Sequence, residues 1–202
     1  MSFCSAVSAT SACSTTEPAV SATPEPELDA LVALAERLAD ASRPVVLRHF
    51  RPGIGFQDKA DLSPVTIADQ EAEAALRAIV AAERPAHGIV GEELDAVAPG
   101  AEYVWVFDPI DGTRSYISGI PLFGTLIALC RHGKPILGVI DQPVLDERWV
   151  GARGRPTTHN GRPVRCRPCP DLAAATVCAT TPDMFRTPPE NAFTALARAA
   201  KL

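Results

Sequence analysis

The stretch from residue 123 to residue 152 limits the fold more than any other part of the sequence. Its apolar residues fall into three strand-length runs, at 123–131, 135–142 and 148–152. The turns between the runs, such as His132-Gly133-Lys134, are far shorter than the crossover of a dozen or more residues that a parallel pair needs. The segment therefore predicts an antiparallel β-meander.

Helical periodicity precedes this meander. Apolar residues recur at helical spacing from Leu28 towards Phe50, with Pro44 as the place for a bend, and a second helix is expected over 66–83. Residues 53–64 break the periodicity and predict a short hairpin or a mobile loop. Helices followed by a β-meander are typical of an α+β fold.

Shorter segments complete the expected order of elements. Strands are predicted at 87–90, 103–107 and 176–180, a turn at Asn160-Gly161, and a helix over 191–202. Residues 1–27 are rich in Ser, Ala, Thr and Pro with few large apolar side chains, so we expect a flexible extension followed by one domain over 28–202.

Composition excludes several classes of function. The formal charge of −5 argues against binding nucleic acid through general electrostatics, because phosphate backbones are held by excess Lys and Arg. The apolar runs are shorter than a membrane-spanning helix needs, so no membrane partner is expected. The first residues lack the basic start and apolar stretch of a secretory signal, which predicts a cytoplasmic protein.

The residues with the strongest chemical signal are Asp108-Pro109-Ile110-Asp111-Gly112-Thr113, where a strand turns towards a possible helix. The two carboxylates and the intervening carbonyl of Ile110 are oxygen ligands of the kind that Mg²⁺ prefers. Backbone N–H groups of Gly112 and Thr113 could bind an anion beside the cation. A turn at Asp-Pro with a capping Thr explains the same residues without a metal, so both interpretations stay open here.

Three acidic residues outside this motif are further candidates. Glu92 and Glu93 end the preceding strand, and strand adjacency could bring Glu92 into a metal shell, whereas Glu93 fits a solvated turn better. Asp69, in the first turn of the second helix, is either a favourable helix start or an acceptor that orients a water molecule.

Two of these motifs carry a resemblance to a known family. Gly91-Glu92-Glu93 and the segment 105–113, Trp-Val-Phe-Asp-Pro-Ile-Asp-Gly-Thr, resemble the inositol monophosphatase family of Mg²⁺-dependent, lithium-sensitive phosphatases. Segment 59–69 and Asn160-Gly161 are similar to other parts of that family, in the expected order. The resemblance implies a layered α/β sandwich of the inositol monophosphatase and sugar phosphatase type, of which 28–202 forms the N-terminal and central part.

The resemblance also implies roles for individual residues. Glu92, Asp108, the Ile110 carbonyl and Asp111 would be metal ligands, in a family that uses two or three Mg²⁺ ions. Glu92 would in addition help to position the attacking water.

Two further implied roles concern that water and the phosphate. Thr113 and Asp69 would polarise the water, and Asp111, Gly112 and Thr113 would hold the phosphate. The family has one more metal-binding Asp in a Trp-Asp pair, and no Trp follows Trp149 in this sequence. We therefore expect an incomplete C-terminal part of the fold and a weakened second metal site.

The residues after Thr113 indicate the substrate. Arg114-Ser115-Tyr116-Ile117 departs from the Asn-Phe continuation of the sugar phosphatases and looks more like the branch that hydrolyses histidinol phosphate. The expected partner is a small phosphorylated metabolite, and the expected activity is hydrolysis of L-histidinol phosphate in histidine biosynthesis. The alternatives are an inositol monophosphatase and an inactive metal-binding remnant, and the family allows for a homodimer in a full-length form.

Overall fold

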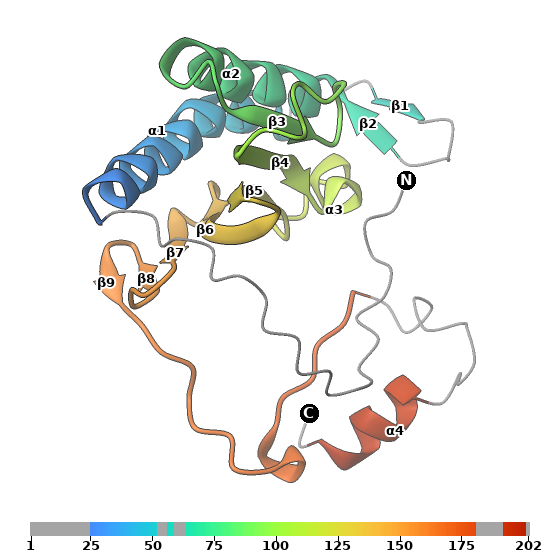
Figure 1. Ribbon diagram of the computed structural model, residues 1–202. Coiled ribbons are helices and arrows are strands. Elements are labelled where there is room, and N and C mark those ends of the chain that lie inside the picture. Colours follow the sequence, from blue (N-terminus) through green and yellow to red (C-terminus); the bar gives the residue numbers. More distant parts are fainter. Residues whose placement is uncertain (1–24, 52–55, 59–63, 181–191, 201–202) are drawn as a thin grey trace. The chain divides into compact units, whose positions relative to one another are not determined.

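The computed structural model describes residues 25–51, 56–58, 64–180 and 192–200. The chain divides into two compact units, Met1–Val164 and Arg165–Leu202, which are described separately. The first unit contains a sheet with two long helices, shown in the upper part of Figure 1. The predicted N-terminal extension lies almost entirely outside the described residues.

The first unit is built on a seven-stranded sheet whose strands follow the sequence order from β3 to β9. The strands are β3 (Gly88–Gly91), β4 (Tyr103–Asp111), β5 (Gly124–Arg131), β6 (Lys134–Gln142), β7 (Glu147–Ala152), β8 (Thr158–His159) and β9 (Arg162–Pro163). β3 and β4 are parallel, and every later pair is antiparallel. The predicted meander is confirmed as β5, β6 and β7.

Turn residues set the ends of these hairpins. Asn160 and Gly161 both have positive φ, at 46° and 75°, and join β8 to β9. Two successive positive φ values are what a tight two-residue hairpin turn requires, and Asn-Gly tolerates them best. The turn predicted at this pair is therefore confirmed.

Helices α1 (Glu25–His49) and α2 (Ile67–Glu83) lie side by side on one face of this sheet (Figure 1). Their apolar stripes and the facing strand residues form the main buried core: Leu31, Leu34, Leu38, Leu76, Val80, Trp105, Phe107, Ile127, Leu129, Leu137 and Val139. This burial explains why α1 continues past Pro44 to His49, although proline removes a helical hydrogen-bond donor. Both predicted helices are confirmed.

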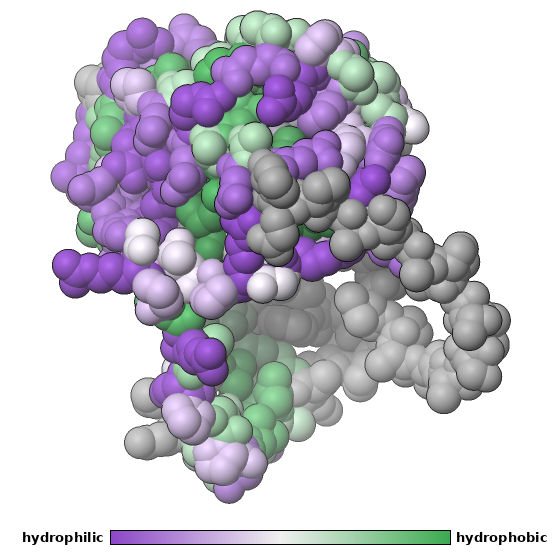
Figure 2. Space-filling view, turned by 60° about the vertical axis from the view of Figure 1, so that its left-hand side comes forward, coloured by the Kyte–Doolittle hydropathy of each residue, from purple (hydrophilic) through white to green (hydrophobic). Residues whose placement is uncertain are grey.

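The opposite face of the sheet is partly exposed in the first unit. Alternation along the strands places Val106 and Ile140 on this face, with exposed fractions of 38% and 50%. In Figure 2, hydrophilic residues cover most of the visible face of the first unit, with some hydrophobic residues among them.

Smaller elements complete the first unit. Strands β1 (Phe56–Asp58) and β2 (Pro64–Thr66) pair antiparallel, so the hairpin predicted between the helices is present. Helix α3 (Thr113–Ile117) follows β4 directly.

The second unit contains a 3₁₀ turn at Leu172–Ala174 and helix α4 (Ala192–Ala199). The C-terminal helix was predicted, but the strand predicted at 176–180 is wrong: these residues form no strand. A strand needs a hydrogen-bonding neighbour, and β-forming residues such as Thr176 and Val177 cannot supply one alone. Within the described residues, no helix combines the length and the apolar character needed to cross a membrane.

Candidate metal and phosphate site

The parallel pairing of β3 with β4 brings Glu92, which follows β3, next to Asp108 in the second half of β4. Gly91 is the register partner of Phe107, so the next residues along the two strands are Glu92 and Asp108. Their side chains share a hydrogen bond. The predicted adjacency of Glu92 and Asp108 is therefore confirmed.

Two more predicted carboxylates act on Asp108. Burial, followed by the charges of Glu92 and Asp111 and a smaller effect of Asp69, raises the pKa of Asp108 to about 7. Asp69 is itself buried in the first turn of α2, while Glu92 and Asp111 are exposed. Asp108 and the three carboxylates that disfavour its ionisation form a donor set that suits a hard cation.

The carboxylates do not yet form a closed coordination shell. In the part of the chain that the structure describes, no three His, Cys, Asp or Glu side chains are close enough together to hold a metal ion as they stand. A cation would have to draw the acids around Asp108 inwards. The chemistry of the donors fits Mg²⁺, and charge neutralisation supplies the driving force for that movement.

The motif 108–111 belongs to a strand rather than to the turn after it. β4 was expected to end at residue 107, but it continues to Asp111, which pairs with Gly124 of β5. The register shifts between Asp108 and Asp111, and a β-bulge of this kind redirects side chains next to functional sites. Inside the bulge, the buried Thr125 hydroxyl donates a hydrogen bond of 2.8 Å to the Pro109 carbonyl.

Gly112 turns the chain from β4 into α3. Its φ is +93°, and a Cβ at this position would lie 2.7 Å from the carbonyl oxygen of Leu122. A side chain is therefore excluded by both backbone conformation and space. Thr113, the first residue of α3, donates its hydroxyl hydrogen to the Ile110 carbonyl at 3.0 Å. The carbonyl predicted to bind metal and the hydroxyl predicted to polarise water thus contact each other.

A small apolar cluster contains residues on both sides of this turn. Tyr116 of α3 packs edge-on against Phe123, with ring centroids 4.9 Å apart, and its hydroxyl donates to the Val46 carbonyl at 2.7 Å. Ile110 is buried in the same cluster. α1 is thereby linked to α3 by a hydrogen bond and shares an apolar cluster with Ile110 of the acidic motif.

Two residues near the site were not found from the sequence. Thr125 contacts the motif only through strand pairing, which no local pattern reveals. Glu73 lies on α2 one helical turn after Asp69, and its buried carboxylate accepts a hydrogen bond from the backbone N–H of Glu93 at 2.8 Å. The spacing of four residues from Asp69 places both acids on one helix face and is the signal that could have indicated Glu73.

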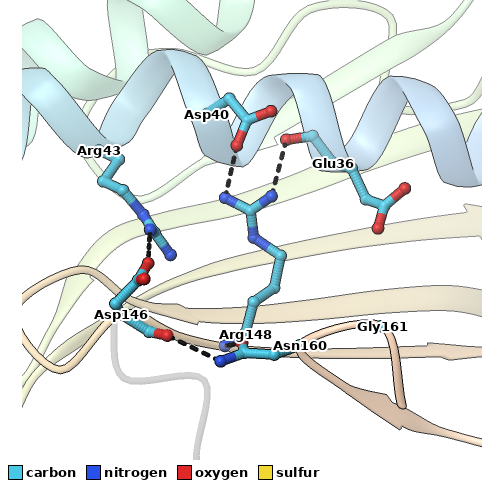
Figure 3. A pocket seen from close by; sticks show the side chains of 7 residues that line it. All are labelled: Glu36, Asp40, Arg43, Asp146, Arg148, Asn160 and Gly161. Atoms are coloured by element: carbon cyan, nitrogen blue, oxygen red, sulfur yellow. Dashed lines mark hydrogen bonds and ion pairs between the residues drawn. The ribbon is translucent and has the colours of Figure 1, made fainter. Parts of the chain in front are cut away.

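A separate polar hollow of about 220 Å³ lies between α1 and the ends of β6 to β8 (Figure 3). Arg43 makes two contacts with the buried carboxylate of Asp141, at 2.8 and 3.1 Å, and also pairs with Asp146. Arg148 contacts Asp141 at 2.7 Å and Asp40 at 2.8 Å. Both guanidinium groups are thus paired with carboxylates of the chain itself. These ion pairs connect α1, which carries Arg43 and Asp40, to the sheet.

Comparison with known proteins identifies the family. The family model described as the inositol monophosphatase family matches residues 27–199. The chain belongs to the inositol monophosphatase family. It is 50% identical over 169 residues to the bifunctional phosphatase IMPL2 of Arabidopsis thaliana, covering 83% of this chain and 49% of that protein. It is 40% identical over 159 residues to a histidinol-phosphatase of Chlorobaculum parvum, covering 78% of this chain and 61% of that protein.

Solved structures agree on the fold. An inositol monophosphatase from Zymomonas mobilis superimposes with a TM-score of 0.76 and 44% identity, covering 86% of this chain and 67% of that one. The predicted fold class, α+β of the inositol monophosphatase type, is therefore confirmed. The chain spans 49% and 61% of the lengths of the two curated relatives named above.

Proposed function

We propose that this inositol monophosphatase family chain carries the metal-binding and phosphate-binding part of a Mg²⁺-dependent phosphatase that hydrolyses L-histidinol phosphate to L-histidinol and phosphate. Its partner is a small phosphorylated metabolite, and the proposed compartment is the cytoplasm. The observation that carries the proposal is the group of carboxylates around Asp108, at the ends of two parallel strands and beside the glycine turn at Gly112.

The proposed roles follow from where each side chain lies. Glu92, Asp108, Asp111 and the Ile110 carbonyl would hold Mg²⁺, which neutralises phosphoryl oxygens and lowers the pKa of a bound water. These ligands come from the ends of β3 and β4, whose pairing sets their separation.

The residues around the turn would act on water and phosphate. Asp69 is buried in the first turn of α2. From there it would accept a hydrogen bond from Thr113 or from a water between them. The Thr113 hydroxyl would leave the Ile110 carbonyl and orient the water for in-line attack. Backbone N–H groups of Gly112 and Thr113, with Asp111 beside them, would fix the phosphate.

Support for the substrate comes from the relatives' names. Histidinol-phosphatases of Chlorobaculum parvum, Mycobacterium tuberculosis and Streptomyces coelicolor are 37 to 40% identical to the chain. Inositol monophosphate is the second candidate, because the Zymomonas mobilis structure of 44% identity is described as an inositol monophosphatase. Arg114 is exposed directly after Gly112 and Thr113, the residues proposed to bind phosphate. There it could contact the rest of a substrate.

The deciding experiment is release of inorganic phosphate from L-histidinol phosphate and from inositol monophosphate, with and without Mg²⁺. The 202-residue chain is compared with Asp108→Asn, which keeps the side-chain size but removes the carboxylate. We expect Mg²⁺-dependent release that favours histidinol phosphate and falls at least about a hundredfold in the variant.

The other outcomes separate the alternatives. Faster release from inositol monophosphate would assign that substrate. Binding of Mg²⁺ without release from either ester would favour a catalytically inactive metal-binding chain, and activity retained in Asp108→Asn would remove the metal model.

A further inference from the structure

Two side chains of α2 hold the turn that carries Glu92. The fully buried Glu73 carboxylate accepts hydrogen bonds from the backbone N–H groups of Glu93, at 2.8 Å, and Leu94, at 3.2 Å. Arg77 donates to Glu73 at 2.7 Å and to the carbonyls of Leu94 and Asp95, at 2.8 and 2.9 Å. Donors and acceptors of the turn backbone are thus both bound by one helix face.

Gly91 makes this contact possible. A Cβ at Gly91 would overlap the Glu73 carboxylate, so the absence of a side chain lets the buried acid approach the end of β3. Glu92 directly follows Gly91. The backbone N–H of the residue after it, Glu93, donates one of the two turn hydrogen bonds that Glu73 accepts. The backbone on both sides of Glu92 is therefore placed by Glu73.

A second set of contacts lies at the base of the loop that contains this turn. Backbone hydrogen bonds between Ile89 and Val97, at 2.8 and 2.9 Å, close the loop at its base. The contacts with α2 act further along the loop, on the backbone of residues 93–95. Glu92, Leu94 and Asp95 are exposed, so packing contributes little to holding them.

We propose that Glu73, supported by Arg77, is a positioning residue that sets the place of Glu92 beside Asp108. This inference rests on the proposed function, in which Glu92 is a Mg²⁺ ligand. Both oxygens of Glu73 are engaged by the turn and by Arg77, so Glu73 acts on the metal through Glu92. Residues that orient metal ligands change metal affinity by roughly 10 to 100-fold when they are replaced.

The test variant is Glu73→Gln, and its matched control is Glu71→Gln. Gln keeps the size, but its amide nitrogen cannot accept the bonds that the lost oxygen accepted. Glu71 lies two residues away on α2 and is also paired, with Arg48 and His49 of α1 rather than with the turn.

Mg²⁺ binding is measured by titration calorimetry on the full 202-residue chain. We expect the dissociation constant to rise about 10 to 100-fold in Glu73→Gln and less than about twofold in Glu71→Gln. Hydrogen exchange at the Glu93 and Leu94 amides should accelerate only in Glu73→Gln. A merely structural role for Glu73 would lower the melting temperature and leave Mg²⁺ affinity unchanged.

Gly91→Ala tests the same contact from the other side, because the added methyl group displaces the Glu73 carboxylate without removing it. It replaces Glu73→Gln if that variant does not fold, and a similar loss of Mg²⁺ affinity is expected. Wild-type affinity in these variants would overturn the positioning role and leave the proposed function intact. A wild-type chain that binds no Mg²⁺ would instead overturn the proposed function, and the positioning role with it.

Discussion

The buried hydroxyl of Thr125 donates a hydrogen bond of 2.8 Å to the carbonyl oxygen of Pro109, across the pair formed by β5 and β4. The acceptor lies inside the bulge between Asp108 and Asp111, where the regular ladder is interrupted. The Thr125 side chain thereby binds the backbone of the bulge, between Asp108 and Asp111.

Replacing this hydroxyl tests its importance. Thr125→Val keeps the shape but leaves the buried Pro109 carbonyl without its donor, which should cost about 1–3 kcal/mol in the free energy of unfolding. We also expect weaker Mg²⁺ binding, since the bulge would relax. Urea unfolding and calorimetry measure the two effects, and Thr125→Ser, which restores the hydroxyl, should recover most of the Mg²⁺ affinity; equal affinity in Val and wild type would contradict the prediction.

The stability of the metal-free protein should depend on the protonation of Asp108. Its pKa is raised from 3.8 to about 7 on folding, so ionisation favours the unfolded chain, and stability from this group falls as pH rises from about 4 to about 7. Asp108→Asn does not titrate. At pH 8 its free energy of unfolding should exceed that of wild type by about 1 kcal/mol, a value reduced for solvent screening. At pH 5 the difference between the two free energies of unfolding should be smaller.

Urea unfolding without divalent cations at the two pH values provides the measurement. A variant that is less stable than wild type at pH 8 would show that the Asp108 carboxylate is not destabilising in the metal-free state.

Mg²⁺ affinity should have the opposite pH dependence. A proton on Asp108 competes with the cation, and a group with a pKa of about 7 is mostly protonated at pH 6. Calorimetry should therefore show about tenfold weaker binding at pH 6 than at pH 8. Affinity that does not change over this range would mean that Asp108 is ionised before the metal arrives.

The ion pairs around Asp141 should contribute strongly to stability. Asp141→Ala would leave Arg43 and Arg148 without their shared buried carboxylate and should cost about 3–5 kcal/mol. The control is Glu83→Gln, which breaks an exposed pair with Arg37 and should change stability by less than about 1 kcal/mol. Chemical unfolding of both variants checks this, and equal effects would show that the Asp141 network has no special weight.

Family membership and the order of elements were within reach of the sequence. Helical spacing from Leu28, the three apolar runs of the meander and Asn160-Gly161 are local signals, and each one specifies its element through neighbours only a few residues away. The motif from Asp108 to Thr113 likewise reveals its chemistry through adjacent residue types.

Contacts between distant residues were decided by the tertiary structure. The pairing of Asp111 with Gly124 extends β4 through the motif, and the lack of a neighbouring strand leaves 176–180 without the predicted strand. Glu73 reaches Glu93 across twenty residues of sequence. The physical reason is that strand hydrogen bonds and buried carboxylates need partners from elsewhere in the chain, and only the folded packing of α2 against the sheet supplies them.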